Sequence, residues 1–307
     1  MSRKIWTLFL AVLLAPCAAL AADETEQGLA TVWEALWHQS GTPTRIVRWD
    51  GEIRMRMTGI DLPKHRDYIV QALRTVTDEA GVKLVDVSDQ PNAEQVANFK
   101  LEVVPDTALE DNQPCVTYLD FRTEDRIDSA TMQMRTKDVW RCAYHESMHL
   151  MGVRGHPGGK TVLSYFPTKV DGLLPLDRAM LRAWYSPRMK GGMTPFEALP
   201  VLADEVVNMA PDKVAAAQTR DHFFSTTVDQ MQAYAAGRGD IPAIVKRSGK
   251  STDEGIRRGR SEMSYFLGVA YFEGAMVAAD QKQALTWFER AASAGNRRAQ
   301  SYLAGPR

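Results

Sequence analysis

The side chains best suited to chemistry lie in one short segment, His145-Glu146-Ser147-Met148-His149. Residues four apart share one face of a helix, so the two imidazoles can reach a single metal ion. Glu146 is offset by one position, where its carboxylate can take a proton from water instead of binding the metal. The spacing therefore predicts a catalytic site for one Zn²⁺ ion, which brings the pKa of its water to about 7.

The motif alone is a weak signal, because a helix with two histidines that face solvent or bond within the core has the same letters. Two observations favour the metal site. Half of the six histidines fall within residues 145–156, since His156 follows the motif closely. Gly152 comes three positions after His149, where the helix must end and the chain must turn back. We therefore expect His156 as the third ligand.

Hydrophobic periodicity indicates the elements that position this site. A helix over 138–151 carries the motif, and further helices are expected over 26–38, 63–80 and 176–185. Strands, or in the first case a strand pair, are expected over 45–58, 82–87, 99–104, 115–121 and 127–134. This order predicts an α+β fold in which one mixed sheet packs against the long helix of the motif.

Residues 145–156 resemble the metzincin metallopeptidases, whose motif continues from the second histidine through a glycine to a third histidine. The segment TVLSYF at 161–166 is similar to their methionine-containing turn, especially in the serralysins. The resemblance covers residues 43–187, and residues 142–188 also resemble an uncharacterised family of exported bacterial zincin-like proteins. It implies a zincin fold, zinc held by His145, His149 and His156, and Glu146 as general base.

The sequence departs from the metzincin pattern at two positions. Gly155 stands where the third histidine is expected, so His156 is one residue late. Leu163 replaces the methionine of the turn, which forms an apolar floor and binds no metal, so leucine is acceptable there. The resemblance also implies that Tyr165 stabilises the oxyanion of the reaction. The alternative for Tyr165 is an aromatic ring that only packs beneath the loop.

The N-terminal residues are typical of an export signal. Two basic residues precede an apolar run over 5–14, and Ala19-Leu20-Ala21 fits a cleavage site. We expect residues 1–21 to be a cleavable signal peptide and the protein to be periplasmic or secreted. Lipidation at Cys17 is the less favoured alternative, because Pro16 stands where a small residue is needed.

Export would leave two cysteines, Cys115 and Cys142, in an oxidising compartment. Cysteines there more often pair than remain free, so we expect a structural disulfide. A metal-thiolate role is the weaker alternative, because their spacing is unlike that of a zinc finger.

The chain divides near residue 190. We expect a zincin-like domain over 22–190, a glycine-containing linker, and a helical domain over 195–307. Residues 263–304 resemble a Sel-one-like repeat, a relative of the tetratricopeptide repeat, because small residues recur where two helices meet closely. Such arrays bind proteins, although a lone unit can equally be structural packing.

Composition limits the partners. The net charge is −1 and no basic cluster stands out in the sequence, so we expect no nucleic-acid partner. No later segment is apolar enough to predict a stable membrane span. The sequence thus predicts an exported zinc metalloendopeptidase that acts on a protein or peptide substrate. The alternatives are an inactive zincin-fold scaffold that binds partners through its repeat, and a nonenzymatic zinc store.

Overall fold

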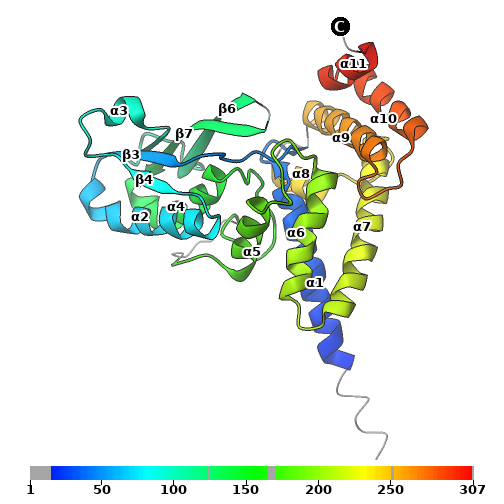
Figure 1. The fold of residues 1–307 in the computed structure, drawn as a ribbon, viewed down its shortest axis with the longest axis horizontal. Coiled ribbons are helices and arrows are strands. Elements are labelled where there is room, and N and C mark those ends of the chain that lie inside the picture. Colours follow the sequence, from blue (N-terminus) through cyan, green and yellow to red (C-terminus); the bar gives the residue numbers. More distant parts are fainter. Residues whose placement is uncertain (1–14, 124, 165–170, 250–251, 306–307) are drawn as a thin grey trace, which may run out of the picture.

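Strands from the first half of the chain form one five-stranded sheet in the order β4-β3-β5-β7-β6 (Figure 1). Four strands are parallel, and β6 pairs antiparallel with β7 at one edge. The predicted mixed sheet is therefore present. The structure is a computed structural model that describes residues 15–123, 125–164, 171–249 and 252–305. The strands of the sheet are β3 (Ile53–Gly59), β4 (Leu84–Asp86), β5 (Phe99–Val104), β6 (Cys115–Thr123) and β7 (Arg126–Arg135).

Two helices, α2 and α4, lie side by side along one face of this sheet (Figure 1). The alternation of the strands explains the packing: Ile53, Met55 and Met57 of β3 are buried, and the residues between them are partly exposed. The other face is largely open to solvent. The helical segments of this half are α2 (Leu62–Glu79), α3 (Ala93–Val96), the short 3₁₀ segment η1 (Thr136–Asp138), α4 (Val139–Leu150) and α5 (Pro175–Trp184).

The strand or strand pair predicted over 45–58 is wrong in its first half, because only β3 is a strand of the sheet. Residues 44–49 run as an extended connection in which Ile46, Val47 and Trp49 are all buried. The backbone of Ile46 bonds to residues 192 and 193, not to a neighbouring strand. Apolar residues occur over 44–49 because this connection is buried between two parts of the molecule. A buried connection and a strand give the same apolar pattern in the sequence.

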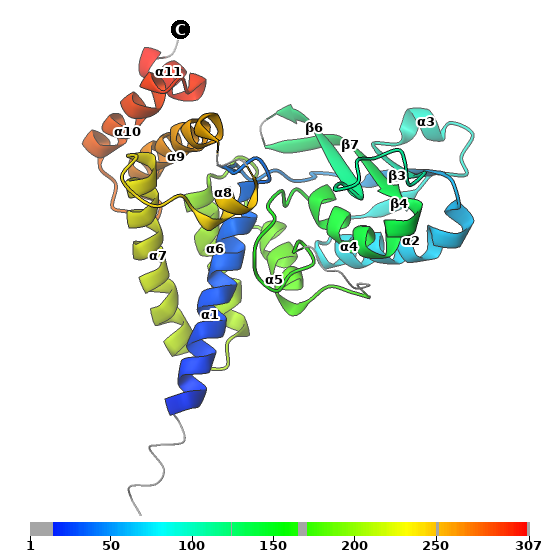
Figure 2. The ribbon, with the colours of Figure 1, turned by 180° about the vertical axis from the view of Figure 1, so that it is seen from behind.

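The C-terminal part of the chain, from residue 195, is helical, as predicted, and one helix from the other end of the chain packs with it. Helix α1 precedes the sheet in sequence but packs against α6 and α7 (Figure 2). We call α1 and α6–α11 the helical half. Its bounds are α1 (Ala15–Ala35), α6 (Pro195–Met209), α7 (Lys213–Ala235), α8 (Ala243–Arg247), α9 (Asp253–Glu273), α10 (Gln281–Ser293) and α11 (Arg297–Ala304). A two-stranded ribbon of β1 (Trp37–His38) and β2 (Thr42–Pro43) follows α1.

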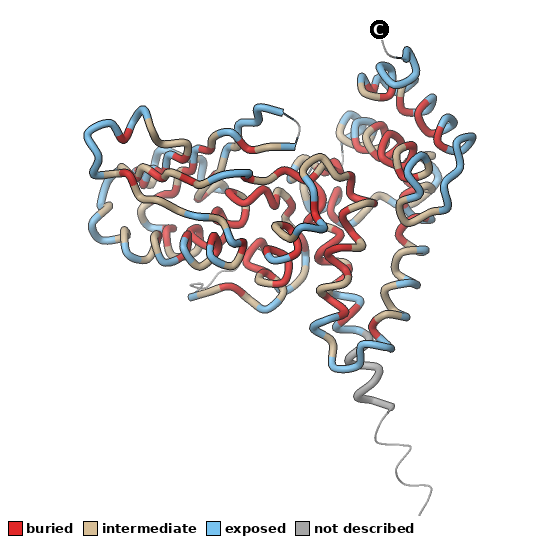
Figure 3. The backbone as a smooth tube through the Cα atoms, in the orientation of Figure 1, coloured by how far each residue is buried: buried red, intermediate tan, exposed pale blue. Residues whose placement is uncertain are grey.

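The buried hydrophobic side chains of the two halves form one continuous cluster. Figure 3 shows buried residues in red along the backbone of both halves. Within the helical half, α9 and α10 pack closely at Gly268. A Cβ atom on Gly268 would lie 2.6 Å from the ring of Phe288, so only glycine fits. The small residues that the repeat pattern predicts between two helices are therefore required by this contact.

The predicted disulfide joins Cys115 to Cys142, with 6.1 Å between their Cα atoms. It ties the first residue of β6 to the first turns of α4, the helix of the His-Glu motif. Over the described part of the chain, no helix has both the length and the apolar character that crossing a membrane requires.

Candidate metal centre

Helix α4 carries His145, Glu146 and His149, as predicted, and its end is fixed by packing. Gly152 has a φ of +95°, and a Cβ atom there would lie 2.1 Å from the carbonyl oxygen of Val47. The indole of Trp49 donates a hydrogen bond to the Leu150 carbonyl at 2.8 Å, which satisfies a backbone acceptor at the helix end. Gly152 is thus the turn at which the chain leaves the helix and returns toward the two histidines.

The three predicted ligands converge on one point. The Nε2 atom of His149 lies 3.0 Å from the Nε2 atoms of both His145 and His156, and the third separation is 3.2 Å. These three histidines are the group that could hold a metal ion among the described residues. Bonds of 2.0–2.1 Å to a tetrahedral zinc ion place ligand nitrogens about 3.3 Å apart. The triangle of nitrogens therefore fits one zinc ion.

The hydrogen bonds of the other ring nitrogens support the same conclusion. His145 Nδ1 donates to the Val162 carbonyl at 2.9 Å, and His149 Nδ1 donates to the Val153 carbonyl at 2.6 Å. A carbonyl only accepts, so the proton of each neutral ring is on Nδ1 and each Nε2 presents a lone pair. Two lone pairs 3.0 Å apart repel each other unless a cation lies between them. The donor set therefore fits a metal better than a network of neutral histidines.

Burial keeps these rings in the form that binds metal. Desolvation is the main cause of a lowered pKa in all three, to about 4 for His149 and about 3 for His156. The pKa of His145 is also well below its ordinary value, with burial first and the other two histidines next as causes. The rings are thus neutral near pH 7, which is the state a metal ligand needs.

His156 is one residue late because of a contact with α1. A Cβ atom on Gly155 would lie 2.4 Å from the carbonyl oxygen of Glu34, so no side chain fits at the position where the resemblance expects a histidine. Two residues beyond His156, the backbone N–H of Gly158 donates to the Glu34 carboxylate at 2.7 Å. The loop is fixed against α1 on both sides of His156, and this course brings the His156 ring to the other two.

Glu146 lies in a cavity of about 330 Å³ beside His149 and His156. Its carboxylate accepts a hydrogen bond from Thr117 Oγ1 at 2.6 Å, and only 3% of the residue is exposed. Burial raises its pKa to about 7, against the opposing effect of the Thr117 hydroxyl. A carboxyl group whose pKa is near 7 can both accept a proton and return it, as a general base and acid must.

One wall of this cavity is the edge strand β6, which contributes residues 115–119 and Phe121. Tyr118 is 59% exposed on that strand, so a large apolar side chain faces the solvent beside the site. The structure thus combines a nitrogen triad, a buried carboxyl group and an open strand edge in one cleft.

The segment after the loop holds His145 in place. Asp177 is fully buried at the start of α5 and accepts hydrogen bonds from the Thr161 hydroxyl, the Val162 N–H and the Leu174 N–H. It therefore caps α5 and also fixes Val162, whose carbonyl orients the His145 ring. Leu163 is fully buried, as an apolar floor residue should be. Tyr165, the predicted oxyanion partner, lies outside the described residues.

Sequence reasoning missed three side chains of the cleft. Thr117 holds Glu146, while His38 and Arg154 line the wall next to His156. Burial, followed by the charge of Arg154, lowers the pKa of His38 to about 4. No spacing or motif relates Thr117 and His38 to the His-Glu segment, because they come from separate strands that only the fold brings to it. Arg154 lies between His149 and His156, but the sequence does not show that its side chain lines the cleft.

Comparison with known families finds one match, a Sel1 repeat over residues 261–296. The match covers most of α9 together with α10, and it confirms the helical repeat predicted for the C-terminal part. Searches of the curated proteins and of the solved structures find no match.

Proposed function

We propose that this chain is a zinc-dependent metallopeptidase with a metzincin-like site. The observation that carries the proposal is the convergence of three imidazole nitrogens, 3.0–3.2 Å apart, beside the buried carboxyl group of Glu146. A tri-histidine set with room for a further ligand is typical of catalytic rather than structural zinc.

A zinc ion held by His145, His149 and His156 would polarise a carbonyl group as a Lewis acid and would make water acidic enough to attack near neutral pH. Glu146 accepts a proton from the attacking water and then delivers it to the leaving amine. Thr117 holds the Glu146 carboxylate in the cleft, so that the proton is taken and returned at a fixed atom. Tyr165 is proposed, from the resemblance alone, as a donor to the oxyanion.

A peptide substrate suits the cleft because β6 is the edge strand of the sheet. Its outer backbone groups can pair with an extended chain, which aligns successive peptide bonds along the strand. The exposed Tyr118 offers an apolar surface to a substrate side chain. Peptide-bond hydrolysis is therefore the reaction that we propose.

The test uses the chain from Ala22 onward, with zinc measured by elemental analysis and proteolysis measured on casein. We expect about one zinc per chain, and we expect Glu146→Ala to keep that zinc while activity falls by about 10²–10⁴-fold. The matched variant Glu94→Ala, at an exposed glutamate far from the cleft, should keep both. A metal-free, inactive protein would refute the proposal, and zinc without any dependence on Glu146 would indicate a zinc store.

A second candidate is a noncatalytic binding protein that works through its helical half. The Sel1 match favours it, since these repeats commonly mediate protein–protein interaction. It predicts a chain that binds a protein partner with or without zinc, whereas the peptidase loses its function with its metal.

We also propose export directed by residues 1–21. The disulfide between Cys115 and Cys142 supports it, because such bonds persist in oxidising compartments. The intact mass of the protein from a periplasmic extract is the test. Cleavage after Ala21 gives a chain that begins at Ala22, and lipidation gives a heavier chain that begins at Cys17.

A further inference from the structure

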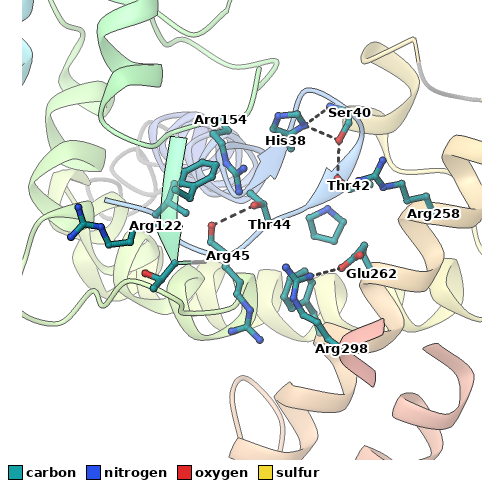
Figure 4. Close-up of a pocket in the computed structure, with 15 residues that line it drawn as sticks. His38, Ser40, Thr42, Thr44, Arg45, Arg122, Arg154, Arg258, Glu262 and Arg298 are labelled. Carbon is teal, nitrogen blue, oxygen red and sulfur yellow. Dashed lines mark hydrogen bonds and ion pairs between the residues drawn. The ribbon is translucent and has the colours of Figure 1, made fainter. Parts of the chain in front are cut away.

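A second cavity of about 560 Å³ lies between the sheet and the helical half, and it is lined by arginines. They come from distant parts of the chain, and Glu262 is the acidic residue of the lining (Figure 4). The arginines are Arg45, Arg122, Arg154, Arg258 and Arg298. Five cationic side chains against one carboxylate give this cavity a positive potential, although the chain as a whole has a net charge of −1.

The arginines are not equivalent, because several already have partners. Arg122 forms an ion pair with Asp128, and Arg298 forms one with Glu262 at 3.4 Å. Arg154 and Arg258 have no carboxylate partner among the residues that the structure describes. Figure 4 shows these two reaching into the cavity from opposite sides, whereas Arg122 turns away from it.

Among these arginines, Arg154 points most directly to an anionic ligand. Its Nε atom is buried and has no hydrogen-bond partner, and its guanidinium lies over the ring of Phe121 at 5.4 Å. Arg154 is partly buried, and a cation removed from water without a paired anion is costly in free energy. A carboxylate that entered the cavity would supply the missing acceptor, in the two-pronged geometry that arginine favours.

The arginine cavity adjoins the metal cleft. His38, Phe121 and Arg154 line both cavities, so one extended molecule can occupy them together. We propose that the arginine cavity binds an acidic side chain or terminal carboxylate of a peptide whose neighbouring residues lie in the cleft of Glu146. The inference deepens the proposed function, since it assigns that site an acidic peptide as substrate. It also relates the cavity to the Sel1 repeat, because Arg258 of α9 and Arg298 of α11 lie just outside the two ends of the matched residues 261–296.

Binding without cleavage tests this inference separately from the peptidase proposal. The chain from Ala22 onward with Glu146→Ala is titrated into a fluorescein-labelled alanine-glycine peptide that carries three glutamates, and anisotropy is measured at low salt. The comparison peptide has glutamines instead. We expect the acidic peptide to bind about tenfold more tightly, and Arg258→Glu in the same background to abolish that preference. Raising the salt concentration should weaken the acidic peptide selectively.

The matched control is Arg290→Glu, which reverses the charge of another exposed arginine, on α10 and outside both cavities. It should keep the preference for glutamate. Arg154→Gln should reduce the preference as well. If that change at a partly buried residue prevents folding, the substitution at the exposed Arg258 is the test. Equal binding of the two peptides, or a preference that survives Arg258→Glu, would overturn the inference. If inorganic phosphate displaces both peptides and the protein shows no preference for glutamate, the cavity is a general anion site, and the inference is again overturned. None of these results depends on whether the protein cleaves peptides.

Discussion

Replacing His156 by alanine tests whether the histidine that is out of register is a true ligand. The Nε2 atom of His156 lies 3.0 Å from that of His149 and 3.2 Å from that of His145. His156 is therefore placed as well as the other two histidines to bind the same metal ion. Zinc sites with four protein ligands release about 10–16 kcal/mol on binding, which is roughly 3 kcal/mol for each ligand. His156→Ala should therefore weaken zinc binding by about 100- to 1,000-fold.

The assay is competition for zinc against a chromogenic chelator, followed by thermal unfolding with and without zinc. Zinc at a thousand times the wild-type Kd stabilises the native state by about 4 kcal/mol, and His156→Ala should lose most of that gain. The control is His222→Ala, which removes an exposed histidine from α7. Circular dichroism of each zinc-free variant shows whether the fold is kept.

One result would refute the reasoning. If His156→Ala keeps the wild-type zinc affinity while His145→Ala and His149→Ala lose it, then the nitrogen triangle is not the metal site. The loop contact at Gly155 would then have only a structural role.

Three further expectations follow from packing and covalent structure. Replacing Cys115 and Cys142 together by alanine should lower the free energy of unfolding by about 3.5 kcal/mol in urea titrations, as expected for a 27-residue loop; an unchanged midpoint would contradict a stabilising bond. Asp177→Ala leaves three donors without an acceptor, two of them buried. It should therefore cost at least about 2 kcal/mol and weaken chelator-measured zinc binding by about 10–100-fold. Wild-type zinc affinity would show that Asp177 only caps α5. Gly152→Ala should cost at least about 2 kcal/mol, because the φ of Gly152 is +95° and the new Cβ atom meets a carbonyl oxygen. Gly51→Ala is the control and should change stability little, because nothing lies within 4 Å of its Cβ position. Equal losses of stability in both variants would refute the contact argument.

The sequence itself determined the local parts of this protein. The period of the helix around His145 and His149, the turn at Gly152 and the two-residue alternation of the strands are all short-range properties. The sheet, the motif helix, the disulfide and the helical C-terminal part were accordingly predictable. So was the set of three histidines, since two share a helix face and the third follows within one loop.

Tertiary structure alone decided how distant segments meet. The helix expected over 26–38 was assigned to the zincin-like domain over 22–190, yet α1 packs in the helical half and fixes the loop of His156 through Glu34. Thr117 reaches Glu146 only because β6 lies at the sheet edge over α4. Arg154 and Arg258 are about a hundred residues apart, so they form no basic cluster in the sequence, but they line one cavity in the fold. The physical reason is that such contacts depend on how large buried faces dock, and no local periodicity encodes that geometry.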